Sequence, residues 1–146
     1  MGDSGWLVVR KGKVVARSEP QTHDFNAPYQ LAKTPRNFPK GFNDTPSKAD
    51  YNEFQCEQGD IIILATDGMF DNVYEYDMLK LLQELGLTNP NELFPRRRAD
   101  SGDSSDSGVE STKEEEDRGV IKRVSMFVQT LVEFTKLRAN DQSYSL

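Results

Sequence analysis

Two aspartates follow the most apolar segment of the sequence. The stretch GDIIILATDGMFDN, residues 59–72, places Asp67 and Asp71 just beyond four branched aliphatic residues at 61–64. Such a run is typical of a strand buried on both faces, which would hold a carboxylate at its end in a fixed position. Fixed carboxylate oxygens suit Mg²⁺ or Mn²⁺, and Gly68 leaves space for a metal, a water or a phosphate to approach. Asp67 is therefore a candidate metal ligand.

The same residues also allow structural interpretations. Asp-Gly is a common turn dipeptide, so Asp67 and Gly68 alone are equally compatible with a tight turn. Either Asp71 or Asn72 is suited to cap a helix beginning near Tyr74. We interpret Asp71 as structural and leave both interpretations of Asp67 open.

A third aspartate lies in the stretch GDSG at residues 2–5. Asp3 leads into an apolar segment and is a second acid at a strand end, with the potential to face the same sheet edge as Asp67. As a serine-protease motif the stretch fails, because His23 is the one histidine of the chain and has no protease-like surroundings. His23 is interpreted as a hydrogen-bonding loop residue. No phosphate-binding glycine loop, zinc spacing or dinucleotide fingerprint is present.

The strands that would position these acids have local signals. Residues 6–9 and 14–16 are rich in β-branched side chains and flank Gly12, which predicts a hairpin. Residues 54–56 and 60–65 are predicted to form a second strand pair joined by the turn EQGD. Cys56 would be a small apolar side chain on the first of these strands. Between the two pairs, five prolines over residues 19–48 predict an irregular connection without ladders.

Two helices and an acidic segment complete the pattern. Residues 74–86 carry leucines at helical spacing and end at Gly86, and Thr88 or Asn89 is suited to cap a short turn after it. A wide apolar stripe predicts a second helix over residues 120–137, and both helices should pack on one domain. Residues 95–118 form an acidic, serine-rich insertion, and residues 101–119 have too few apolar side chains to fold.

Composition excludes several classes of protein. A formal net charge of −6 and a pI near 4.8 argue against a nucleic-acid surface. No apolar run approaches the roughly 20 residues of a membrane helix, so we expect no membrane span. A single cysteine excludes an internal disulfide framework and is compatible with a reducing, intracellular compartment. The abrupt start in a strand-like stretch suggests that further sequence lies upstream.

Taken together, the segments GDSG, HDFNAPYQL and GDIIILATDGMFDN resemble the PPM-type (protein phosphatase 2C) metal-dependent Ser/Thr phosphatases, and in particular their mitochondrial branch. The resemblance covers roughly residues 2–94 and, more loosely, 119–146. It implies an α+β fold, part of an antiparallel β-sandwich flanked by helices. It also implies two Mn²⁺ or Mg²⁺ ions that activate a water to attack phosphoserine or phosphothreonine.

By this resemblance Asp67 corresponds to the aspartate that binds the catalytic metal pair, and Asp3 to one that binds a further, weaker metal. It assigns no direct catalytic duty to Asp71, His23 or Cys56. The implied partner is a phosphoprotein substrate, and the implied location is the mitochondrial matrix. The oligomeric state is not indicated by any part of the sequence.

The sequence also departs from the family pattern. An upstream aspartate motif and a late aspartate-bearing strand are absent, so two expected metal ligands are missing. We therefore expect residues 1–94 to be a partial phosphatase domain, residues 95–118 an insertion, and residues 119–146 a helical continuation truncated before the last ligand strand. The alternatives are a catalytically inactive binding module and an interaction protein whose Ser101, Ser104, Ser105 and Ser107 form a phosphorylation-controlled docking arm.

Overall fold

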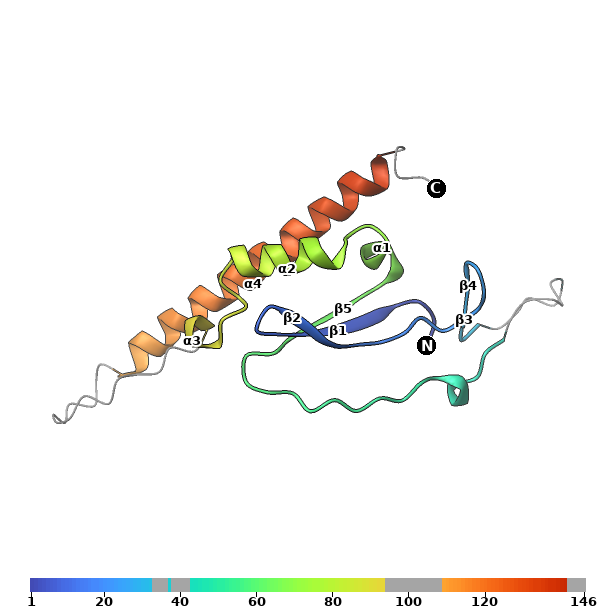
Figure 1. Ribbon diagram of the computed structural model, residues 1–146, viewed down its shortest axis with the longest axis horizontal. Coiled ribbons are helices and arrows are strands. Elements are labelled where there is room, and N and C mark those ends of the chain that lie inside the picture. Colours follow the sequence, from blue (N-terminus) through green and yellow to red (C-terminus); the bar gives the residue numbers. More distant parts are fainter. Residues whose placement is uncertain (33–36, 38–42, 94–108, 142–146) are drawn as a thin grey trace.

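The computed structural model of the chain describes residues 1–32, 37, 43–93 and 109–141. Along the described chain the strands come first and the α-helices follow, and the strands form a small sheet and a separate short pair (Figure 1). The elements are, in order, β1 (Gly5–Arg10), β2 (Lys13–Arg17), β3 (Thr22–Asp24), β4 (Ala27–Pro28), the 3₁₀ turn η1 (Pro46–Lys48), β5 (Ile61–Ala65), α1 (Asp67–Phe70), α2 (Glu75–Glu84), α3 (Pro90–Leu93) and α4 (Val109–Asn140).

The predicted hairpin is confirmed as β1 and β2. Its two-residue loop consists of Lys11 and Gly12, whose φ angles are 50° and 76°. Positive φ at both positions is what a type I′ turn requires, and its twist matches that of the flanking strands. Glycine takes this conformation without steric cost, whereas Lys11 takes it at some cost.

Only one strand of the second predicted pair forms. Strand β5 forms as expected, but it pairs antiparallel with β1, so that the sheet has the order β2-β1-β5. Residues 54–56 form no strand, and Cys56 is exposed rather than packed. This segment is held by side-chain hydrogen bonds instead of a strand ladder. Arg10 donates to the carboxylates of Asp60 and Glu57 and to the carbonyl of Gln55.

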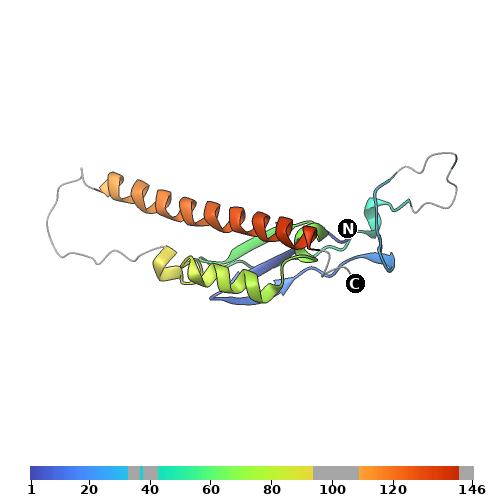
Figure 2. The ribbon, with the colours of Figure 1, turned by 90° about the horizontal axis from the view of Figure 1, so that it is seen from above.

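One face of the sheet is the core of the molecule. Leu7, Val9 and Ile63 point from it toward α2 and α4, which lie side by side across the strands (Figure 2). The contributions of the helices to this core are Met78 and Leu82 from α2 and Phe127 and Leu131 from α4. The predicted α+β arrangement of antiparallel strands with helices outside is confirmed for this part of the chain.

Helix α2 ends where the sequence predicts. Gly86 has a φ of 64°, the amide of Leu87 donates to the carbonyl of Leu82, and the amide of Gly86 donates to that of Gln83. These two bonds form a Schellman motif, which satisfies carbonyls at the helix end. Leu82 and Leu87 are both buried, so the motif also closes an apolar contact. The predicted cap of the next turn is confirmed as well, since the Oδ1 of Asn89 accepts from the amide of Asn91.

The opposite face of β5 is largely open. Ile62 is 51% exposed and Leu64 is 75% exposed, whereas Ile63 between them is buried. Side chains alternate between the faces of a strand, so only every second aliphatic residue reaches the core. The prediction that this strand is buried on both faces is therefore wrong for the part of the chain that the structure describes.

Helix α4 is longer than the sequence suggests. It begins at Val109, so residues 109–119, which we expected to lack structure, are helical, while residues 95–108 lie outside the described residues. A packed helix extends at little cost through good helix formers, and Arg118 forms an ion pair with Glu114 one turn away. The predicted apolar stripe is only partly covered, since Val124, Val128 and Leu137 remain exposed.

The proline-rich connection is more ordered than predicted. Strands β3 and β4 form a short antiparallel pair in which Thr22 faces Pro28, a residue that an edge position tolerates. Asn26, in the turn between them, has a φ of 52°, a conformation that asparagine adopts more readily than most residues.

Among the described residues, no helix combines the length and the apolar character needed to cross a membrane.

Candidate functional site

The register of the sheet brings two of the predicted acids to one edge. Gly5 at the start of β1 pairs with Ala65 at the end of β5. Asp3 lies two residues before the first of these positions and Asp67 two residues after the second. Antiparallel pairing therefore places both strand-end acids at the same edge of the sheet, as the sequence analysis expects.

Two glycines fix the path of the chain on either side of Asp3. Gly2 has a φ of 81°, and a Cβ there would lie 3.0 Å from the carbonyl oxygen of Tyr29. A Cβ at Gly5 would lie 3.0 Å from the Oγ of Ser18 and 3.2 Å from the ring of Phe70. These distances are shorter than most Cβ contacts, so a side chain at either position would require its neighbour to shift, and at Gly2 it would also meet a strained φ. Asp3 is thus held between two close backbone approaches.

Asp67 opens the one-turn helix α1 and does not form a hairpin turn. Its exposed carboxylate accepts a bond of 2.7 Å from the amide of Gly68. Asp71 follows four residues later at the C-terminal end of α1 and is also exposed. Residues four apart share a helix face, so the two carboxylates are neighbours on α1.

The predicted helix cap at Asp71 or Asn72 is wrong. The N-cap of α2 is Tyr74, which makes no side-chain cap bond. Asn72 instead donates from its side-chain amide to the carbonyl of Gly68, and its own carbonyl accepts from Arg138 of α4. These bonds attach the segment after Asp71 to α1 on one side and to α4 on the other.

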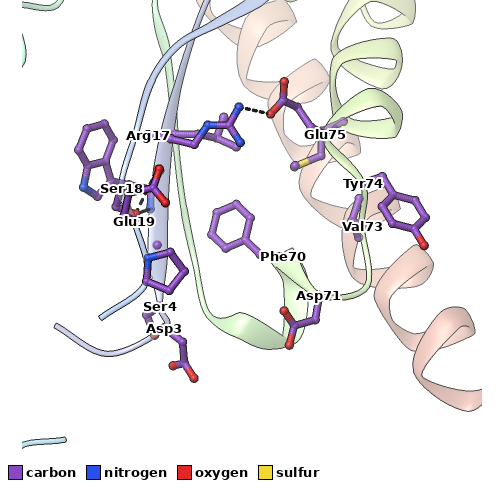
Figure 3. A pocket seen from close by; sticks show the side chains of 15 residues that line it. Asp3, Ser4, Arg17, Ser18, Glu19, Phe70, Asp71, Val73, Tyr74 and Glu75 are labelled. Carbon is purple, nitrogen blue, oxygen red and sulfur yellow. Dashed lines mark hydrogen bonds and ion pairs between the residues drawn. The ribbon is translucent and has the colours of Figure 1, made fainter. Parts of the chain in front are cut away.

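A pocket of about 360 Å³ opens at this edge, and it brings Asp3 together with Asp71. Figure 3 shows both carboxylates in the lower part of the view, with the ring of Phe70 above them. Asp67 is not among the residues that line this pocket. The sequence analysis interprets Asp71 as structural, whereas the structure places it in the lining of this pocket with Asp3.

Within the described residues, the three acids Asp3, Asp67 and Asp71 form no ion pair with a cationic side chain. Arg17 also lines the pocket, but its guanidinium is bound to Glu75 at 2.7 Å, shown by the dashed line in Figure 3. Like charges four apart on a helix repel, so this edge would gain stability from a bound cation.

The three acids have the donor atoms that a divalent metal prefers, but they are too few to hold it tightly. Carboxylate oxygens are the donors that Mg²⁺ and Mn²⁺ prefer, and both ions also keep several waters. Within the described part of the chain, however, no group of three or more His, Cys, Asp or Glu side chains lies close enough to hold a metal. A tightly held pair of ions therefore requires further ligands.

A buried carboxylate that the sequence analysis did not single out stabilises the region beside Asp3. Asp44 accepts bonds from the Nε2 of His23, the Nζ of Lys48 and the amide of Gln30, all between 2.9 and 3.0 Å. Burial alone would raise its pKa, but these bonds outweigh that effect and lower the pKa to about 2. The hydrogen-bonding role predicted for His23 is confirmed, although the residue lies in β3 and not in a loop.

This network is connected to the edge through the backbone. The carbonyl of Gly2 accepts from the amide of Gln21, and the amide of Tyr29 donates to the carbonyl of Gln21. The ring of Tyr29 in turn lies 4.2 Å from that of His23. The segment of β3 and β4 is thus fixed next to the residue that precedes Asp3.

Comparisons with known proteins agree with the resemblance seen in the sequence. The chain is 49% identical over 90 residues to the protein phosphatase PTC7 homolog of Xenopus laevis. The aligned region covers 61% of this chain and 30% of that protein. It is 37% identical over 148 aligned positions to the PTC7 homolog fig of Drosophila ananassae, covering 99% of this chain and 40% of the relative. No protein-family model matches the chain.

A solved structure extends the likeness to the fold. The photosystem II phosphatase PBCP superposes with a TM-score of 0.50 at 32% identity, over 57% of this chain and 30% of that one. The chain thus spans 30% to 40% of the length of these relatives. In sequence and in fold it resembles part of a protein phosphatase of the PPM type.

Proposed function

We propose that this chain is part of a metal-dependent protein phosphatase that hydrolyses phosphoserine and phosphothreonine. The observation that carries the proposal is the register of β1 and β5, which puts Asp3 and Asp67 at one sheet edge. Relatives named as protein phosphatases share this part of the sequence at 37% to 49% identity. The acids at the edge form no ion pair with any described residue, so they suit a divalent metal.

Asp67 and Asp3 are the proposed metal ligands of this chain, and the pocket adds Asp71. Bound Mn²⁺ or Mg²⁺ supplies a water of lowered pKa as the nucleophile and neutralises charge on the phosphoryl group. The protein's own contribution is to hold its carboxylates in place through the strand ends and the turn of α1. The remaining ligands would come from parts of the phosphatase domain that these 146 residues do not include.

The substrate is a phosphoprotein, and the mitochondrial matrix is the proposed location. Both proposals rest on the resemblance to the mitochondrial branch and on relatives that carry the PTC7 name. Fractionation of cells that produce the full protein would test the location. Recovery of the protein outside mitochondria would contradict it.

One observation favours a second candidate function, a binding module without catalysis. The described residues contain no group of three metal-ligating side chains, and two carboxylates with waters hold Mg²⁺ weakly. In that case the edge binds a phosphorylated protein or a metal without turnover. The two functions differ in whether the chain releases phosphate.

The deciding experiment compares Mn²⁺-dependent hydrolysis of an aryl phosphate by the chain and by its Asp67→Ala variant. Asp24→Ala is the matched control, because Asp24 is also exposed and its Oδ1 accepts from the next amide at 2.7 Å, as that of Asp67 does. We expect Asp67→Ala to lose at least about tenfold of the activity and Asp24→Ala to keep it. Equal activity in the chain and in Asp67→Ala, or none in both, would remove the catalytic proposal and leave the binding module.

A further inference from the structure

Arg138, near the end of α4, contacts the segment that joins α1 to α2. Its Nη1 donates to the carbonyl oxygen of Asn72 at 2.8 Å, and its Nη2 donates to the Oδ2 of Asp77 at 2.6 Å. Its guanidinium carbon lies 4.9 Å from the centroid of the Tyr74 ring, in a cation–π contact. Figures 1 and 2 both show the C-terminal part of α4 passing close to this segment.

The contacted segment directly follows Asp71. The amides of Asn72 and Val73 both donate to the carbonyl of Met69, so these bonds hold the segment to α1. Helix α1 has only one turn, and a single turn of helix is marginal by itself. Arg138 adds a bond from α4, a long helix that is anchored in the buried core. The segment is therefore held to a more rigid part of the molecule than α1 alone provides.

An arginine is well suited to this set of partners. Its planar guanidinium presents donors in fixed directions, so one side chain can bind a carbonyl and a carboxylate at the same time. The side chains of Arg138 and Asp77 are 25% and 27% exposed, so their ion pair is screened less than one on the open surface. Because the other partner is a main-chain carbonyl, the contact restrains the path of the backbone and not merely a side chain.

The restrained backbone carries part of the candidate site. Asp71, at the C-cap of α1, lines the pocket together with Asp3, and Tyr74 lines it as well. Figure 3 shows Asp71 and Tyr74 along the segment that leads from α1 to α2. We propose that Arg138 is a positioning residue, which fixes the backbone after Asp71 and so holds that carboxylate beside Asp3. The inference rests on the proposed function, because a metal ion is what requires both carboxylates in one place.

Two simpler roles for Arg138 make different predictions. A cation near the acids repels a metal ion, so a role through charge alone predicts that removal of Arg138 raises the affinity for metal. A role in stability alone predicts a lower unfolding midpoint and an unchanged metal affinity of the folded chain. Positioning predicts a lower affinity, because the carboxylate would no longer be held where the metal binds. The three roles therefore differ in the direction in which metal affinity changes.

The first test measures Mn²⁺ binding by the full chain from the electron paramagnetic resonance signal of free Mn²⁺. We expect Arg138→Ala to bind Mn²⁺ roughly tenfold more weakly, as for loss of an outer partner of a metal ligand. Arg138→Lys should lie between the two, because it keeps the charge but lacks the planar fork. Arg10→Ala is the control, since it removes an equally bonded guanidinium at the opposite end of β1 from Gly5 and should keep the affinity. Equal or tighter binding by Arg138→Ala, or an equal loss in Arg10→Ala, would overturn the inference.

The second test uses amide hydrogen exchange without metal, so it does not depend on the proposed metal site. In Arg138→Ala the amide of Val73 should exchange at least about tenfold faster, while that of Leu82 in α2 should keep its rate. An unchanged rate at Val73, or an equal increase at Leu82, would overturn the inference whatever the chain binds. Faster exchange at Val73 in Arg138→Ala, with no Mn²⁺ binding by the unchanged chain, would support the hold of Arg138 on the segment and remove only the proposed metal site.

Discussion

The carboxylates of this chain fall into two groups that differ in their partners. Asp44 and Asp60 have side chains that are 1% and 3% exposed, and each accepts several bonds from cationic or backbone groups. Asp3, Asp67 and Asp71 lie at the sheet edge without a cationic partner among the described residues. The first group stabilises the fold, whereas the second leaves its charge available to something outside the chain.

The pKa values express the same difference. Arg10 holds the Asp60 carboxylate with two bonds of 2.8 Å and lowers its pKa to about 2, against the opposing effect of burial. The bonds from Lys48 and His23 to Asp44 have a similar result despite its burial. A carboxylate that already accepts from three donors has few free lone pairs for a metal. The satisfied acids are therefore structural, whereas the acids without an ion-pair partner among the described residues are the proposed metal ligands.

The largest expected effect is the loss of both buried networks in acid. Because the pKa values of Asp44 and Asp60 are about 2 in the folded state and 3.8 ordinarily, the unfolded chain takes up protons first as the pH falls. Stability from these groups is therefore complete above about pH 4 and is lost as the pH falls toward 2. Thermal unfolding followed by circular dichroism should show a midpoint temperature that decreases as the pH is lowered from about 4 to about 2.

The matched control for the acid effect is the double variant Asp44→Asn, Asp60→Asn. Its midpoint should be lower at neutral pH and should depend less on pH between about 4 and 2, because neither amide titrates. If the double variant and the unchanged chain lost the same number of degrees across this window, the two aspartates would not be responsible for the acid sensitivity.

The next largest effect is expected from Asp60→Ala. The substitution removes both bonds to Arg10 and the bond from the amide of Glu57, and it leaves the guanidinium of Arg10 half-buried with fewer acceptors. We expect the unfolding midpoint to fall by about 5–10 °C. Arg10→Ala should lower it at least as much, because it leaves the nearly buried carboxylate of Asp60 without its cation. An unchanged midpoint in Asp60→Ala would contradict the structural role.

A smaller and more local effect is expected from Asp44→Asn. An amide cannot satisfy two cationic donors and a backbone amide as a carboxylate does, so His23 and Lys48 lose part of their contact. The segment of β3, β4 and η1 should open more often, while α2 and β1 remain protected. Hydrogen exchange at Gln30 and Tyr29, compared with that at Leu82, measures this difference. Equal changes in both regions would show that Asp44 stabilises the whole domain.

The sequence predicts elements whose signals are local. The hairpin of β1 and β2 follows from a two-residue loop with glycine, and the end of α2 follows from the position of Gly86 after the leucine pattern. The pairing of β5 was misassigned because it joins residues more than 50 positions apart, and no local pattern specifies that register. The proline-rich stretch likewise concealed Asp44, whose partner His23 is 21 residues away.

The candidate site shows the same limit. Asp67 and Asp3 stand out because each adjoins an apolar segment, and that signal is readable from the sequence. The position of Asp71 in the same pocket as Asp3 depends on the direction of the chain at the C-cap of α1, which only the folded chain shows. Exposure of Ile62 and Leu64 was also missed, because a run of aliphatic residues does not reveal whether both faces of its strand are covered.

The smallest expected effect on stability completes the comparison. Asp3→Asn and Asp71→Asn should change the unfolding midpoint by no more than about 2 °C without metal, because neither carboxylate has an ion-pair partner among the described residues. With Mn²⁺ present, the midpoint of the unchanged chain should rise with metal concentration, since a ligand that binds only the folded state stabilises it. Both variants should reduce this rise, whereas Asp24→Asn should keep it, because Asp24 is exposed but does not line the pocket. A rise of equal size in all of these proteins would show that Mn²⁺ binds elsewhere, and the distinction between structural and functional acids would then lose its basis.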